Sequence, residues 1–425
     1  MTHWLLALVL AALPLMATAA DNPADAADLP PRAQVLEALS SSPLVRAAGS
    51  VIEAEEARSR RLAAGTHEWT VRLTDQRRTV RATPDGRFNE WNVGVERALR
   101  LPGKGELDRQ LGAAGIASAQ ISRGDALHEA SRMLLSSWFE WLRERAAAEQ
   151  WSRQRDILAR QAQVVGRRVE LGDAPRLERL QADAALAQAD AQLAQALGRA
   201  EVAAEQLRRL YPALSLPTQL ADVAPPAVEP DAGNWVNAIL EHNHELGVAR
   251  SESARARIQA TRADAERRPD PSVGVHMAND RGGEERIVGL TLSIPLPGEG
   301  RRADADMAVA SAQASAHREA GVLRRVEAEA ATVYRRATAA HAGWQSQKLA
   351  AEALGHSADL TERAWQLGEG SLTDTLAARR LAHEARLAAR FAQLDASEAR
   401  YRLLLDAHRL WPLDTDDDDD SHDHH

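Results

Sequence analysis

The residues with the clearest capacity for chemistry lie at the C-terminus, in the segment DTDDDDDSHDHH. Imidazole and carboxylate groups together suit Zn²⁺, Co²⁺, Ni²⁺ or Cu²⁺. A run of acids alone is typical of a disordered, solubilising tail, and this remains the alternative. Because three of the last four residues are His, we predict a divalent-metal-binding tail over residues 412–425. The candidate ligands are Asp416, Asp417, Asp418, Asp419, Asp420, His422, Asp423, His424 and His425.

Catalytic patterns are missing from the rest of the sequence. It has no Gly-rich phosphate loop, no GxSxG elbow, no HExxH pair and no Cys. We therefore expect no enzymatic activity and no cofactor beyond possible metal ions at the tail. The net charge is −9, seven Asp lie in the last twelve positions, and no basic surface indicates nucleic-acid binding. We interpret the scattered His242, His244 and His341 as surface residues.

A five-residue turn occurs twice, as LPGKG at 101–105 and as LPGEG at 296–300. Alternating apolar and polar residues precede each copy, and each alternating stretch follows another across a polar, Gly-bearing turn. This pattern predicts two β-hairpins, at about 67–100 and about 272–296. We expect Pro to end each strand and Gly to allow the bend into the next helix, at Pro102, Gly103, Pro297 and Gly298.

The predicted strands have the length and alternation of transmembrane β-strands. Four strands cannot close into a barrel, and an open sheet edge in lipid leaves backbone groups unpaired at a cost of several kcal/mol each. Several chains must therefore contribute strands to one barrel. The sequence alone leaves open whether two or three chains do so.

A long helical pattern without Pro follows each repeated turn, over 106–171 and 301–367. Each long helix is predicted to end at a Gly, and the helices that return, of about 35 and 40 residues, are too short to pair along it. Helices from about Ala33 to Ala64 and from Trp235 to about Glu266 would cover the remainder. This arrangement places the Pro-rich linker and both termini near mid-height of the long helices.

The first twenty residues have an apolar stretch followed by small residues, as in an export signal. We therefore predict a signal peptide over 1–20, a first repeat over 21–225, a second repeat over 226–411 and the tail over 412–425. The expected fold is mainly α with a small β part. It comprises a long antiparallel α-helical barrel and four transmembrane β-strands per protomer, in two internal repeats.

With its doubled helices and hairpins, its Pro-Gly steps after the second and fourth strands and its Gly turns at the helix tips, the chain resembles the TolC-like outer-membrane efflux channels. The resemblance implies a homotrimer with a twelve-stranded barrel in the outer membrane and a helical tunnel through the periplasm. It also implies a periplasmic adaptor protein and an inner-membrane RND-type pump as partners. With the tail, it favours the CzcC-like cobalt-zinc-cadmium branch and the export of heavy-metal cations.

The resemblance also implies roles at the two tip turns, RVELGDAPRLERLQA and RAWQLGEGSLTDTLAA. In a trimer, Glu178 and Asp374 would form rings of negative charge at the periplasmic entrance and favour cations. The alternative is that both are solvated acids at helix starts. The residues expected to contact the adaptor are Leu171, Gly172, Asp173, Leu367, Gly368 and Glu369.

Two other functions stay open. The same channel would serve equally for drugs or dyes, since the pump often selects the cargo. A periplasmic coiled-coil scaffold that never enters the membrane would use the helices, but it has no need of amphipathic hairpins long enough to cross a lipid bilayer.

Overall fold

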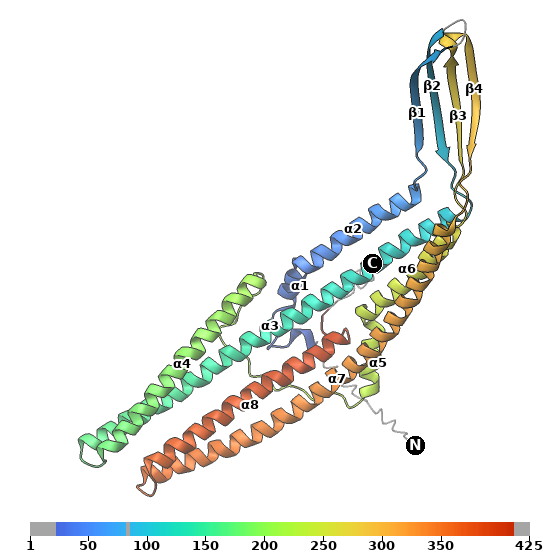
Figure 1. Cartoon of the computed structure of the whole chain (residues 1–425). Helices are drawn as coiled ribbons and strands as arrows, with labels where there is room; N and C mark the ends of the chain where they lie inside the picture. The colour runs from blue at the N-terminus through green and yellow to red at the C-terminus, as the bar shows by residue number, and fades with distance from the viewer. Residues whose placement is uncertain (1–22, 82–85, 412–425) are drawn as a thin grey trace, which may run out of the picture.

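The chain is described here from a computed structural model, which describes residues 23–81 and 86–411. The predicted signal peptide at 1–20 and the predicted metal-binding tail at 412–425 lie outside these residues. The molecule is elongated, with a sheet at one end and two helix-to-helix turns at the other (Figure 1).

Two long helices form the frame: α3 (Lys104–Glu170, 67 residues) and α7 (Glu299–Gln366, 68 residues). At 1.5 Å per residue each is about 100 Å long. Their bounds agree with the sequence prediction to within two residues, because the Pro-Gly step before each helix and the Gly after it are strong local signals. Within the described residues, no helix carries an apolar stretch long enough to cross a membrane.

Two helices of 35 residues each, α4 (Arg176–Leu210) and α8 (Leu372–Asp406), return from the turns and pack along α3 and α7 respectively. Nearer the sheet, α2 (Pro43–Ala64) packs on α3, and α6 (His244–Ala265) packs on both α3 and α7. Each long helix is therefore flanked by an interrupted partner, as predicted.

The partners near the sheet are themselves divided, which corrects the prediction of one helix in each place. A short α1 (Arg32–Ser40) precedes α2, and α5 (Ala232–His242) precedes α6. Proline at the first position of α2 lacks the N–H that would continue α1. Asn243 ends α5 and caps α6, with its side-chain oxygen accepting a hydrogen bond from Leu246 N at 2.7 Å.

Four antiparallel strands form one sheet in the order β1-β2-β3-β4: β1 (Trp69–Val80), β2 (Gly86–Ala98), β3 (Ser272–Asp280) and β4 (Glu285–Ser293). The two hairpins are confirmed, and they join through β2 and β3, where Val95 lies opposite Val275. Of the described strands, β1 and β4 form the two edges of the sheet. Short 3-10 turns occur at η1 (Pro23–Asp25) and η2 (Arg281–Gly283).

The largest hydrophobic core lies halfway along the long helices. It combines the first described residues, the middle of α3 and α7, the Pro-rich linker, α5 and the segment after α8. Trp138 on α3 donates its Nε1–H to the carbonyl oxygen of Asp28 at 2.8 Å, and the Tyr401 hydroxyl donates to Asp28 Oδ1 at 2.6 Å. The beginning and end of the described chain therefore meet at mid-height, as the helix lengths predicted.

Candidate functional site

One face of the sheet is apolar and lies open. The side chains of Leu73 and Leu290 are 72% and 87% exposed, and the pleat places both on the same face. They belong to two rows that cross all four strands. These rows are Val71, Val95, Val275 and Leu290, and Leu73, Val93, Met277 and Val288. An apolar face of this extent in an isolated chain matches the lipid-facing side of a transmembrane strand set.

The opposite face of the sheet is polar. Arg72 pairs with Glu96 across β1 and β2 at 3.0 Å, and Thr291 lies 3.2 Å from Nδ1 of His276. The His276 ring lies over Gly289, where an added Cβ would come within 2.3 Å of it. A polar face opposite a lipid-facing one is what a water-filled lumen requires.

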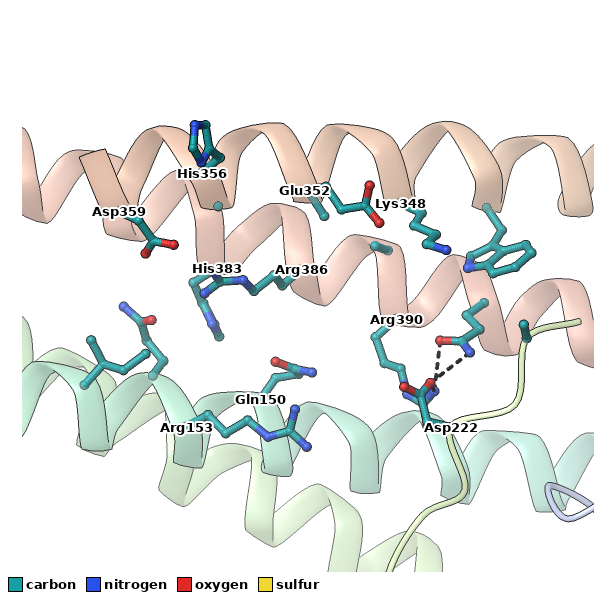
Figure 2. Close-up of a pocket in the computed structure, with 18 residues that line it drawn as sticks. Gln150, Arg153, Asp222, Lys348, Glu352, His356, Asp359, His383, Arg386 and Arg390 are labelled. Atoms are coloured by element: carbon teal, nitrogen blue, oxygen red, sulfur yellow. Dashed lines mark hydrogen bonds and ion pairs between the residues drawn. The ribbon is translucent and has the colours of Figure 1, made fainter. Parts of the chain in front are cut away.

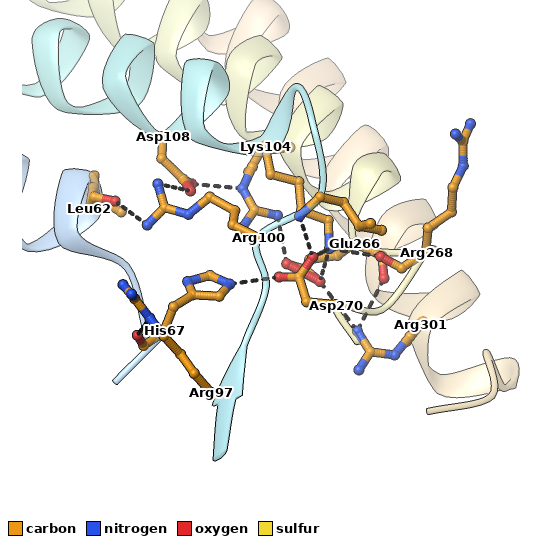
Figure 3. Close-up of polar contacts among 12 residues, drawn as sticks. Leu62, His67, Arg97, Arg100, Lys104, Asp108, Glu266, Arg268, Asp270 and Arg301 are labelled. Atoms are coloured by element: carbon orange, nitrogen blue, oxygen red, sulfur yellow. Dashed lines mark hydrogen bonds and ion pairs between the residues drawn. The ribbon is translucent and has the colours of Figure 1, made fainter. Parts of the chain in front are cut away.

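The first repeated turn carries a buried cation that the sequence interpretation missed (Figure 3). Lys104, the variable residue of LPGKG, has a side chain that is only 2% exposed. Its ammonium donates to Glu266 Oε2 at 3.0 Å, to Asp270 Oδ1 at 2.9 Å and to the carbonyl of Arg268 at 2.7 Å. Each of the three ammonium protons thus donates a hydrogen bond, and these bonds link α3 to the segment between α6 and β3.

Asp270 is the centre of this junction. Besides Lys104, it accepts hydrogen bonds from the backbone N–H of Leu101 at 3.0 Å and from His67 Nε2 at 3.0 Å. Burial alone would raise the pKa of Asp270, but the bonds from Lys104, Leu101 and His67 outweigh it and hold the pKa below the ordinary value. The carboxylate therefore stays ionised and joins β1, α3 and β3 at the point where strands become helices.

The two copies of the turn differ in conformation, which corrects part of the prediction. Gly103 has φ of 92°, so the bend there does require glycine. Gly298 has φ of −117°, which any residue adopts, and the prediction that glycine is needed for the bend is wrong at this copy. Pro102 and Pro297 are both exposed. Glu299, at the place of Lys104, is exposed rather than buried.

Both tip turns share one geometry at the end farthest from the sheet. Gly172 has φ of 77° and Gly368 has φ of 81°. After each, the next N–H reaches back to the last helical turn: Asp173 N to Arg168 O at 2.8 Å and Glu369 N to Ala364 O at 2.8 Å. These are Schellman caps, which close a helix with a left-handed residue and expose the turn.

The predicted contact residues all lie on the surface of these turns. Leu171 and Leu367, the residues before the two glycines, are 68% and 70% exposed. Both leucines therefore lie open to solvent, as the predicted contact requires. Gly172, Asp173, Gly368 and Glu369 are exposed as well.

Inside the molecule the two tips contact each other. The Arg168 guanidinium lies 5.4 Å from the centre of the Trp365 ring and bonds Asp173 at 2.8 Å. Trp365 itself is buried in a small apolar cluster between the helix pairs. Arg168 and Trp365, one from each tip turn, thus form one contact that joins the repeats.

Glu178 and Asp374 occupy equivalent positions in the first turn of α4 and α8. Asp374 is exposed, its backbone N–H bonds Ser371 Oγ at 3.1 Å, and the Ser371 hydroxyl donates to its carboxylate at 2.7 Å. Ser371 is thus the N-cap of α8, and Asp374 also bonds its hydroxyl. Glu178 is half-buried, and its Oε2 is buried without a hydrogen-bond partner. Capping thus explains Asp374 as a local structural residue but does not explain Glu178.

A groove of about 820 Å³ lies between α3, α7, α8 and the linker (Figure 2). Its labelled side chains carry both signs of charge, which favours no single class of ion. Asp222 of the linker is held there by Arg390 at 2.9 Å and by Gln393 at 3.0 Å. At its floor, His383 packs on Trp151 with ring centres 4.2 Å apart. Burial, followed by the charge of Arg386, lowers the pKa of His383 to about 4.

Comparisons with known proteins agree with this geometry. The outer membrane efflux protein family model matches residues 235–405. The structure is similar to that of CusC, at 15% identity and a TM-score of 0.73, covering 88% of this chain and 91% of that one. It is also similar to VceC from Vibrio cholerae, at 18% identity and a TM-score of 0.70, covering 88% and 95%. For the CmeC channel of Campylobacter jejuni the identity is 12%, the TM-score 0.69 and the coverage 90% and 86%.

No curated protein matches the sequence significantly. The family match covers the second repeat, while the fold is shared with solved outer-membrane channels over nearly the whole chain. Proteins of the matched family are channels rather than enzymes. The chain therefore has the fold of solved outer-membrane channels, and residues 235–405 match the outer membrane efflux protein family.

Proposed function

We propose that this chain is the outer-membrane duct of a tripartite efflux system, formed by three copies and open to divalent heavy-metal cations. The observation that carries the channel is the four-stranded sheet, with one open apolar face, one polar face and two edge strands. In lipid each unpaired backbone group costs several kcal/mol, so β1 of one protomer pairs with β4 of the next. Three protomers give a twelve-stranded barrel that encloses the polar faces.

The partners follow from the family, whose channels work as trimers with periplasmic adaptors and RND-type pumps. For this chain the adaptor contacts the two tip turns, where Leu171 and Leu367 offer exposed apolar side chains. Buried apolar residues surrounded by polar ones give an interface most of its binding energy. Replacing both leucines by Ser should abolish capture of the adaptor in crosslinking. Preserved capture would contradict this contact.

The periplasmic entrance is selective for cations in this proposal. Three copies of Glu178 and three of Asp374 would surround the axis near the tips, and rings of carboxylates favour cations. The unpartnered Oε2 of Glu178 supports a role beyond capping.

Metal cations are the proposed cargo because of the Asp- and His-rich tail at 412–425. A drug or dye channel of the same fold is the second candidate. Replacing residues 414–425 by an equally long Ser- and Asn-rich segment tests the choice in cells that depend on this channel. The proposal expects reduced growth in Zn²⁺ or Co²⁺ and unchanged growth in dyes. Equal growth of both strains in metal would overturn the metal cargo while leaving the channel itself in place.

A further inference from the structure

Four histidine rings gather at mid-height, although they are far apart in the sequence. His128 lies on α3, His242 and His244 lie on either side of the break between α5 and α6, and His408 follows α8. The centre of the His408 ring is 5.0 Å from that of His244, 5.2 Å from that of His242 and 5.6 Å from that of His128. The rings of His128 and His244 are 6.2 Å apart. His242 is exposed, as predicted, and His244 is half-buried, but both belong to this cluster.

These separations are close to those of imidazoles that share one metal ion. With metal–nitrogen bonds of about 2.0 Å, a ring centre lies about 3.2 Å from the ion, and two ligands at the tetrahedral angle have centres about 5.2 Å apart. Four such rings are not expected to cluster in a hydrophobic core, since imidazole is polar and is stabilised by hydrogen-bond partners for both nitrogens.

The backbone is shaped to bring the rings together. His408 has φ of 56°, in the left-handed region that residues other than glycine rarely adopt. The residue closes α8 at the position where the tips use glycine, with Arg409 N bonding Leu404 O at 2.7 Å. The ring of His244 lies over Gly124 of α3, where a Cβ would come within 2.6 Å of it. The left-handed backbone of His408 and the absence of a side chain at Gly124 beneath His244 both allow the rings to lie close together.

Two of the rings are already held in the way that metal ligands are held. His242 Nδ1 lies 3.0 Å from the carbonyl of Ala238, and His128 Nε2 lies 3.3 Å from Oδ1 of Asp406. Ligating imidazoles usually direct their second nitrogen to a carbonyl or carboxylate, which fixes the ring and raises its basicity. With these contacts, His242 Nε2 and His128 Nδ1 are the nitrogens that would face an ion.

Carboxylates surround the cluster. Asp406 is buried and also bonds Arg132 and Arg402, each at 3.0 Å. Asp125 and Glu245 lie close enough to influence each other electrostatically. Carboxylate charge beside imidazole ligands is favourable for a bound divalent cation.

We propose that His128, His242, His244 and His408 bind one transition-metal dication of the Zn²⁺, Co²⁺, Ni²⁺ or Cu²⁺ class. Within residues 23–81 and 86–411, no three His, Cys, Asp or Glu side chains are already placed to hold a metal ion, so the rings turn when the ion binds. The ion ties the segment after α8 to α3 and to the α5–α6 break. This site does not depend on which cargo the channel exports.

The test is a Co²⁺ titration of the purified full chain, in which His422, His424 and His425 are replaced by Asn to silence the tail. Tetrahedral Co²⁺ gives visible absorption bands, and Zn²⁺ should displace it. We expect one ion per protomer. His408→Ala should weaken binding at least tenfold, since even partners of metal ligands are worth 10–100-fold. His317→Ala, at an exposed position on α7, is the matched control and should bind like the parent.

A second variant distinguishes a loss of metal binding from a folding defect. Gly124→Ala keeps all four imidazoles but displaces the ring of His244, and it should also weaken binding while the particle keeps its mass. The proposal fails if the chain with the silenced tail binds no Co²⁺, which would assign all metal binding to the tail. It also fails if His408→Ala and His317→Ala bind with equal affinity.

Discussion

Replacing Lys104 by Met tests the junction between strands and helices. Met keeps most of the side-chain volume but leaves Asp270 and Glu266 without the ammonium that both of them contact at about 3 Å. Removing one partner of a buried ion pair typically costs 3–5 kcal/mol. Glu266 keeps Arg262 and Arg301 as partners, so we expect the lower end, a loss of about 3 kcal/mol in the free energy of unfolding per protomer.

Denaturant unfolding of the detergent-extracted protein measures this loss, and the second copy of the turn supplies the control. Glu299→Met changes the equivalent residue, whose side chain is 85% exposed, and should stay within about 0.5 kcal/mol of the parent. The loss should also shrink with acid. In the folded protein the pKa values of Asp270 and Glu266 lie below the ordinary values of 3.8 and 4.5. The stabilisation from these carboxylates is therefore present above the ordinary values and is lost as the pH falls through the pKa values of the folded protein.

Two results would refute this reasoning. The first is a loss for Lys104→Met no larger than that for Glu299→Met, which would mean that the buried network contributes nothing net. The second is a loss that stays constant from pH 7 to pH 3, which would mean that packing rather than charge accounts for it.

Three further predictions follow from single residues. Gly103→Ala should lower the free energy of unfolding by about 1 kcal/mol, whereas Gly298→Ala should not lower it, because only Gly103 has a positive φ. Equal losses for the two variants in thermal unfolding would contradict this. The pKa of His383 is lowered from 6.5 to about 4, so the unfolded chain binds the proton first as the pH falls. The free energy of unfolding should therefore decrease by about 2 kcal/mol per protomer as the pH falls from 6.5 to 4, after solvent screening. His383→Gln should lose this part of the pH dependence in denaturation curves. Asp374→Asn should lower cation over anion selectivity several-fold in planar bilayers, and an unchanged reversal potential would assign Asp374 to capping alone.

Local signals made much of this fold predictable. The period-two stretches mark all four strands, and the glycines at 172 and 368 mark the tips. The breaks before α2 and α6 also have local signals, Pro43 and Asn243, but the amphipathic pattern continues across both and suggested single helices.

Contacts between distant segments were not predictable in this way. No sequence feature near Lys104 predicts its contact with Asp270, which belongs to the second repeat and comes close only when β2 pairs with β3. The histidine cluster likewise requires α3, the α5–α6 break and the end of α8 to meet at one height. Its local signal is slight: His408 follows α8 where a glycine is common.

The twelve-stranded barrel requires that the sheet of each protomer is completed by the sheets of other copies. The direct measurement is the mass of the particle extracted by detergent from the outer-membrane fraction. We predict a particle of three chains, found in that fraction and not among soluble periplasmic proteins. A monomer or dimer, or a particle released without detergent, would contradict the twelve-stranded barrel and the channel built on it.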